Sequence, residues 1–174
     1  MTDSRTNFRA ARPTRRADFQ NIATASPRTL RQAIQAAVDA IGDEALKRLL
    51  PDNALTFAQC RAVLAALTLC YARQIYSSTV AATLVARDLY FPCLCGGGFP
   101  DAYVLRRFRA ENREAIHRCL TAALYFLVEQ KFSSGVVTKV NVPQVAEEAN
   151  RRIIMAMFVD SMELDGEGAD YRAV

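Results

Sequence analysis

The chain has 174 residues and a mass of 19.3 kDa, which suits one domain with terminal tails rather than two domains. Apolar residues make up 51% of it, which excludes global disorder, and no apolar run approaches the roughly 18 residues of a membrane span. The net charge is +4, with +7 in residues 1–120 and −3 in residues 121–174. A basic first part favours a polyanionic partner, although an ordinary solvated surface explains the same asymmetry.

The cysteine count and the N-terminus indicate a reducing compartment. Five cysteines are an odd number, most of them lie in apolar, helix-like stretches, and the polar, Arg-rich start of the chain carries no secretory signal. We therefore expect a cytoplasmic protein without a disulfide framework. The cysteines are Cys60, Cys70, Cys93, Cys95 and Cys119.

The first 28 residues predict a flexible basic arm, rich in Arg, Thr and Ser. Such arms lie along a phosphate backbone or enter a minor groove, and they are equally often plain disordered termini. Arg12, Arg15 and Arg16 are its candidate DNA contacts.

Apolar periodicity and capping residues predict helices through most of the remaining chain. A helical DNA-binding domain is expected over 29–132, a linker and C-terminal helix over 133–163, and an acidic tail that frays over 164–174. Residues 136–142 alternate and are β-branched, so this segment is either a short strand or an extended link. The fold class is all-α, a helical bundle. The predicted helices cover residues 26–41, 43–50, 56–75, 79–90, 101 onward with a break near Asn112 left open, 116–132 and 143–163.

Two of these helices predict a helix-turn-helix-like pair. Ser77 and Ser78 cap the first helix, and Asp101 caps a second helix that is rich in arginine. An arginine fork binds guanine edges or phosphates in two-pronged fashion, which suits a helix that enters a major groove. The connection of about ten residues is longer than the usual three or four, and a helix pair within a bundle explains the pattern equally well. The candidate contacts of the second helix are Arg106, Arg107, Arg109 and Arg113.

The order of several short motifs, over residues 50–131, resembles the helical N-terminal domain of insertion-sequence transposases that carry a DDE nuclease. That family reads Tyr-Ser-Ser-Arg, a Phe-x-x-Leu-x-Gly segment, Pro-Asp-His and then Arg-Phe-Arg. The resemblance implies a DNA-binding domain that serves DNA recombination, with Arg107 and Arg109 as transferable contacts. The matching pieces are Tyr76-Ser77-Ser78, Arg87-Asp88-Leu89-Tyr90-Phe91, Leu94-Cys95-Gly96-Gly97, Pro100-Asp101 and Arg107-Phe108-Arg109.

Departures from the family limit what the resemblance implies. Thr79 stands where the family has Arg, and Ala102, Tyr103, Val104 and Arg106 stand where it has His and small hydroxylated residues. A family DNA sequence specificity therefore does not transfer. The three carboxylates of a DDE nuclease need an RNase H-like sheet after residue 135, and the remaining residues read as one helix and a tail. We expect no enzyme activity and no catalytic residues.

No metal or cofactor site is predicted. Cys93 and Cys95 are spaced more tightly than zinc ligands usually are, and His117 and Cys119 have apolar neighbours, so core packing is the favoured interpretation. Asp160, Glu163 and Asp165 are interpreted as a solvated helix end rather than a metal site.

The sequence thus predicts a stand-alone, transposase-like DNA-binding protein without a nuclease, a remnant or a domesticated regulator. Two alternatives stay open: a helical protein–protein interaction module that has lost DNA binding, and a subunit completed by a separately encoded nuclease. Double-stranded DNA is the expected partner. The wide apolar stripe of the last helix, which includes Ile153 and Phe158, either closes the bundle or forms a homodimer interface.

Overall fold

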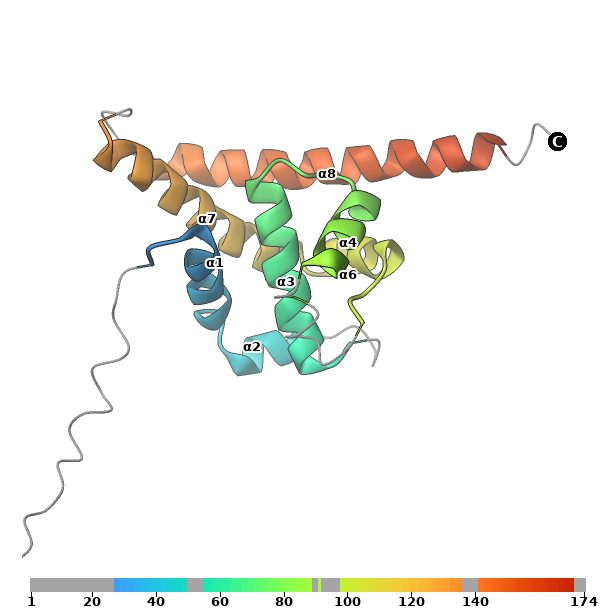
Figure 1. The fold of residues 1–174 in the computed structure, drawn as a ribbon, viewed down its shortest axis with the longest axis horizontal. Coiled ribbons are helices and arrows are strands. Elements are labelled where there is room, and N and C mark those ends of the chain that lie inside the picture. Colours follow the sequence, from blue (N-terminus) through green and yellow to red (C-terminus); the bar gives the residue numbers. More distant parts are fainter. Residues whose placement is uncertain (1–26, 50–54, 89–90, 92–97, 136–140, 171–174) are drawn as a thin grey trace, which may run out of the picture.

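The computed structural model describes residues 27–49, 55–88, 91, 98–135 and 141–170, with side chains to residue 165. Within these residues every regular element is a helix, so the predicted all-α class is confirmed. The helices form a bundle beneath one long helix that runs along its edge (Figure 1). They are α1 (Leu30–Asp39), α2 (Asp43–Arg48), α3 (Phe57–Ala72), α4 (Ser78–Arg87), α6 (Ala102–Glu111), α7 (Arg113–Ser133) and α8 (Val142–Asp170).

Helix α3 is the centre of the bundle. Thr56 begins it with a capping box, in which the Thr56 hydroxyl accepts from the Gln59 amide and the Gln59 side chain accepts from the Thr56 amide. From Cys60 onward nearly every side chain is buried, and the helix contacts α1, α2, α4, α6, α7 and α8. A helix that is apolar on all sides requires such surroundings.

Two long helices cover the core. Helix α7 packs against α1 and α3 through a buried stripe that includes Ile116, Leu120 and Leu124, and α8 packs against α7. Helix α8 buries Val145, Ala149, Ile153 and Ala156 at spacings of three and four residues. One face of the last helix therefore closes the bundle.

Helix α8 is also anchored to α3 by a polar contact. The Arg152 guanidinium donates from Nη1 to the carbonyl oxygens of Tyr71 and Ala72, at 3.0 and 2.9 Å. These carbonyls belong to the last turn of α3, where the Tyr71 oxygen also accepts from the Gln74 amide at 3.1 Å, and a cation is favoured at this end of the helix dipole. Arg152 thereby acts as a side-chain cap for α3.

The predicted element order agrees with the structure, and the main differences lie at the C-terminal end. The sequence left open whether the helix that begins at Asp101 runs on or breaks near Asn112, and the structure has the break, since Asn112 ends α6. Helix α8 begins at Val142, so the extended segment predicted up to Val142 is wrong at that residue, while residues 136–140 lie outside the described residues. The prediction that the chain frays after Glu163 is also wrong, because α8 continues to Asp170. Residues 1–26 of the predicted basic arm lie outside the described residues.

Within the described part of the chain, no helix combines the length and the apolar character that crossing a membrane requires.

Candidate nucleic-acid interface

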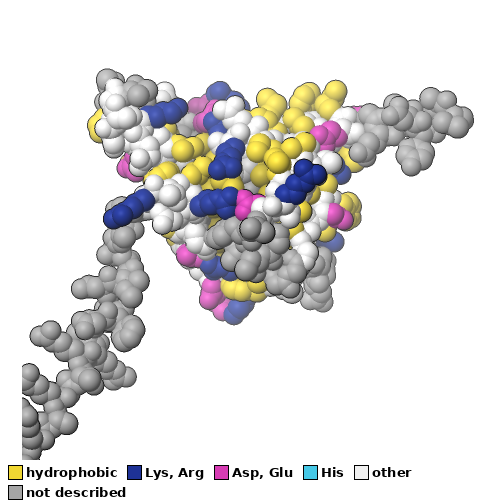
Figure 2. Space-filling model, in the orientation of Figure 1, with side chains coloured by type: hydrophobic (Ala, Val, Ile, Leu, Met, Phe, Trp, Pro, Cys, Tyr) yellow, Lys and Arg dark blue, Asp and Glu magenta, His cyan; other side chains and the backbone are white. Residues whose placement is uncertain are grey.

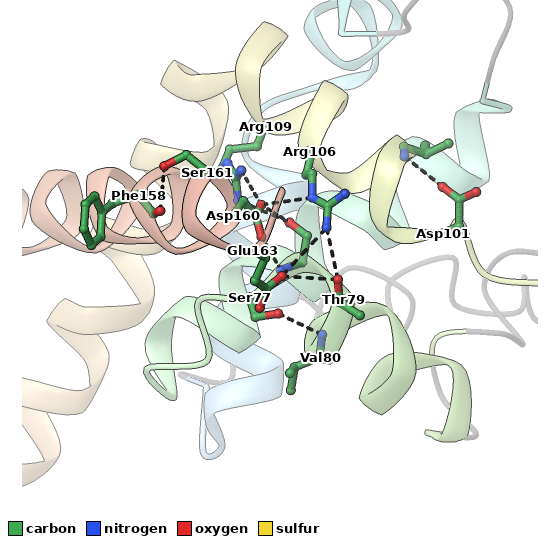
Figure 3. A network of polar contacts seen from close by, with 12 residues as sticks. Ser77, Thr79, Val80, Asp101, Arg106, Arg109, Phe158, Asp160, Ser161 and Glu163 are labelled. Carbon is green, nitrogen blue, oxygen red and sulfur yellow. Dashed lines mark hydrogen bonds and ion pairs between the residues drawn. The ribbon is translucent and has the colours of Figure 1, made fainter. Parts of the chain in front are cut away.

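The predicted helix pair consists of α4 and α6, which contact each other and both contact α3. Ser77 caps α4 by accepting a hydrogen bond from the Val80 amide at 3.1 Å, and Asp101 caps α6 by accepting from the Val104 amide at 2.9 Å (Figure 3). Ser77 is the cap and Ser78 is already the first helical residue. Both capping interactions were predicted from the sequence. Ser77 and Asp101, which belong to the motif, therefore have a structural role as helix caps.

Arg109, a predicted DNA contact, lies inside the protein. Its Nη2 donates to Asp160 Oδ2 at 2.5 Å, and its Nη1 donates to the hydroxyls of Tyr71 at 3.1 Å and Ser78 at 3.3 Å. The Arg109 side chain is 5% exposed and that of Asp160 is 3% exposed. In this conformation Arg109 therefore has no access to a phosphate or a base edge, and its role is to join α6 to α3, α4 and α8.

Ser78 completes the same buried network. Its backbone amide donates to Asp160 Oδ1 at 2.8 Å and its hydroxyl donates to Asp160 Oδ2 at 2.5 Å. Asp160 thus receives hydrogen bonds from the first turn of α4 and from Arg109, which compensates the burial of its charge. Asp160 is therefore not part of a solvated helix end, and the expectation that it is solvated is wrong. Burial also raises the pKa of Tyr71 to about 12, with Arg109 partly opposing the rise, so this hydroxyl stays protonated at neutral pH.

Arg106 faces the same acidic residues of α8. Its Nη2 donates to the Thr79 hydroxyl at 3.0 Å, its Nε lies 3.7 Å from Asp160 Oδ2, and its Nη2 lies 3.8 Å from Glu163 Oε2 (Figure 3). The buried Nε makes no hydrogen bond among the described residues. Two of the three predicted cations on α6 are thus neutralised by α8 within the same chain.

Arg107 and Arg113 are the predicted cations that remain near the surface. Arg107 Nε pairs with Glu111 Oε1 at 2.8 Å, one turn along α6, and its side chain is 39% exposed. Arg113, exposed at the start of α7, donates to Asn150 of α8 at 2.8 Å. The most exposed large apolar side chain in the described residues is Tyr103, at 68%, on the first turn of α6. In the sequence, Tyr103 stands out only as a departure from the family pattern.

The location of net charge also bears on DNA binding. Residues 1–28 hold six arginines and two aspartates, and their net charge of +4 equals that of the whole chain. Residues 29–174 hold 16 cations and 16 acidic residues. The bundle itself therefore carries no net positive charge. Arg12, Arg15 and Arg16 belong to this basic arm and lie outside the described residues.

Comparisons with protein families, with curated proteins and with solved structures gave no match to this chain. Any functional inference therefore depends on its own residues and on the motif resemblance stated above.

Of the residues considered as zinc ligands, Cys119 and His117 both lie on α7, in different environments. Cys119 is buried in α7, and burial raises the pKa of its thiol to about 12. His117 Nε2 lies 2.9 Å from the Ala146 carbonyl oxygen, which links α7 to α8. Cys93 and Cys95 lie outside the described residues, and within the described part no three His, Cys, Asp or Glu residues cluster as metal ligands would.

Proposed function

We propose that this chain is a DNA-binding protein built on a transposase-type helix pair. One observation carries the proposal: among the described residues, those that match the transposase motif cap the two helices and join them to each other. Ser77 and Asp101 cap the two helices, Phe108 is fully buried, and Arg109 reaches Ser78 across the pair. Motif residues far apart in the sequence thus build one helix pair, as expected if the resemblance reflects a shared scaffold.

The proposed DNA contacts differ from the motif arginines. Arg109 is engaged in the core, so the exposed side of α6, with Tyr103 and Arg107, is the surface that we propose for base or backbone contact. The charge for phosphate binding comes from the basic arm, because the rest of the chain is electrically balanced. No phosphodiester chemistry is proposed, and the Asp160 carboxylate is occupied by Arg109 and Ser78.

The experiment is binding of the full chain to random duplex DNA, followed by fluorescence anisotropy from about 50 to 200 mM salt. We expect the logarithm of the association constant to fall linearly with the logarithm of the salt concentration. The triple variant Arg12→Ala, Arg15→Ala and Arg16→Ala should make this negative slope shallower by roughly 2.7. The control removes the same charge from exposed sites elsewhere, through Lys47→Ala, Arg48→Ala and Arg73→Ala, and should change the slope less. Absence of binding at about 50 mM salt would contradict the proposal.

A second candidate function is protein–protein interaction, which the exposed apolar side chains of α8 favour. Ile154, Met155, Met157, Phe158, Met162 and Leu164 are each more than 40% exposed. The two candidates are compatible, because helix-turn-helix proteins commonly bind DNA as dimers. We therefore include a homodimer formed through the C-terminal helix in the proposed function.

A further inference from the structure

The outer side of α8 carries a stripe whose centre, around Phe158, is apolar. With 100° between successive residues, Phe158 lies opposite the buried positions Val145, Ala149, Ile153, Ala156 and Asp160, and it is 59% exposed. Ile154, Met155 and Met162 flank it on the same side. Hydrophobic side chains project along this outer edge, where α8 runs with the other helices all on its inner side (Figures 1 and 2).

The residues on either side of Phe158 along the stripe are complementary. Four residues to either side stand Ile154 and Met162, and seven residues to either side stand Arg151 and Asp165. Seven residues are nearly two helical turns, so both charged residues lie on the same stripe as Phe158. The helix thus presents an apolar centre with a cation at one end and an anion at the other.

We propose that a second copy of this chain docks on this stripe, with the two α8 helices antiparallel and a two-fold axis at Phe158. This inference deepens the homodimer included in the proposed function. In that arrangement Phe158 meets its own equivalent, Ile154 meets the partner's Met162, and Arg151 meets the partner's Asp165. A parallel arrangement instead places Arg151 against Arg151 and Asp165 against Asp165, which like-charge repulsion disfavours.

The polar residue within the stripe fits such an interface. Ser161, which lies opposite Met155 of the second copy, donates its hydroxyl to the Phe158 carbonyl oxygen at 2.8 Å (Figure 3). Its hydrogen-bonding capacity is therefore used within its own helix, and burial against the second copy leaves no donor unsatisfied. Arg151, with a side chain that is 70% exposed, reaches only Glu148 at 3.5 Å, a contact that a closer partner replaces at small cost.

The size of the surface indicates a weak, reversible pair. The four apolar side chains and the two flanking charged residues expose on the order of 500 Å² per chain, so a pair buries about 1,000 Å², the lower end of specific interfaces. The expected pair is therefore reversible, with a dissociation constant on the order of micromolar.

Sedimentation of the full chain without DNA, from about 1 to 200 µM, tests the pair separately from DNA binding. Wild-type chain should dimerise, and Phe158→Glu should weaken the dimer at least about 100-fold while its circular dichroism stays helical. Tyr103→Glu, the matched control at an exposed aromatic on α6, should dimerise like wild type. A wild-type monomer at every concentration, or a Phe158→Glu chain that still dimerises, overturns the proposal. Loss of helicity in both Phe158→Glu and Met162→Lys also overturns it, since the stripe then belongs to the core.

Charge reversal tests the antiparallel register. Arg151→Glu and Asp165→Arg should each weaken the dimer about tenfold, because each reversal repeats twice about the two-fold axis. The double variant Arg151→Glu with Asp165→Arg restores opposite charges and should recover wild-type affinity. A double variant no tighter than the single variants contradicts the antiparallel pairing.

Discussion

Arg109 of α6 and Asp160 of α8, which are 51 residues apart in the sequence, form a buried ion pair at 2.5 Å. The pair joins the arginine-rich helix α6 to the last helix α8, and Ser78 adds the first turn of α4 to the same carboxylate. The residue that the motif resemblance nominated for DNA contact thereby becomes part of the interior.

Removing either partner of this pair should strongly destabilise the fold. Arg109→Ala and Asp160→Ala each leave an uncompensated buried charge, so we expect the free energy of unfolding to fall by about 3–5 kcal/mol in each. The double variant should cost less than the two single changes together. Urea denaturation measures all three, and Arg107→Ala is the control, because its exposed ion pair with Glu111 is worth about 0–1 kcal/mol. Additive effects would show that the two side chains do not interact.

The neighbouring residues Arg151 and Arg152 should differ sharply in their contribution to stability. Arg152→Ala removes two hydrogen bonds to carbonyls at the end of α3 and should lower the free energy of unfolding by about 2–3 kcal/mol. Arg151→Ala, at an exposed position on the same helix, should change it by less than about 0.5 kcal/mol. Thermal denaturation at low protein concentration measures both without a contribution from dimerisation. Equal effects would refute the capping role of Arg152.

Gln74 is a site for a stabilising substitution. It follows α3 with a φ of +62°, the left-handed conformation that glycine adopts without steric cost. Gln74→Gly should therefore raise the free energy of unfolding by about 0.5–1 kcal/mol, or the melting temperature by about 2–4 °C. Gln74→Ala keeps the unfavourable Cβ and serves as the control. A melting temperature that rises equally in both variants would show that backbone strain is not the cause.

The buried thiols and Tyr71 predict a loss of stability at high pH. Burial raises the pKa of Cys60 and Cys70 to about 11, and the pKa of Cys119 and Tyr71 to about 12, from ordinary values of 9.0 and 10.0. The folded state holds these protons more tightly than the unfolded state, so their contribution is complete below pH 9 and is lost as pH rises through 9 to 12. Urea denaturation at pH 8 and pH 10.5 should show the decrease. Stability that stays constant over this interval would contradict it.

The same burial predicts selective thiol chemistry. At pH 8 in the folded protein, Cys60, Cys70 and Cys119 should resist alkylation, because only the thiolate reacts and all three side chains are buried. They should react fully in denaturant. Peptide mapping by mass spectrometry measures each site, and rapid labelling of any of the three in the folded state would contradict the core that contains them.

Local rules predicted the helices well, and they could not predict which way the charged side chains point. Thr56, Ser77 and Asp101 have capping chemistry that the sequence displays directly. The direction of the Arg109 side chain depends on Asp160, which is 51 residues away in the sequence. A pattern among neighbouring residues carries no information about a partner at that separation. A signal for Asp160 did exist: the apolar positions Val145, Ala149, Ile153 and Ala156 lead at the next spacing of four to residue 160. An acidic residue in the apolar register of an amphipathic helix requires a buried partner.

The C-terminal boundary was missed for a related reason. Gly166 and Gly168 suggested a tail, yet each glycine costs a helix only about 1 kcal/mol, and α8 continues through both. Propensity is a weak constraint beside a helix already nucleated and held along its length.

The polar contacts of Arg152 and Asp160 also determine the position of α8 along its own axis relative to the bundle. Arg152 and Asp160 are eight residues apart, about 12 Å along the axis, and each fits one partner set: the end of α3 and the start of α4. The apolar contacts of Val145, Ala149, Ile153 and Ala156 are not directional, so they define the position of α8 along its axis less strictly than the two polar contacts do. A shift of α8 by one turn, about 5.4 Å, would leave both Arg152 and Asp160 without their partners. These two contacts therefore fix the position of α8 along its axis. Any partner that binds the outer side of α8 consequently finds Phe158 at a fixed position relative to the bundle.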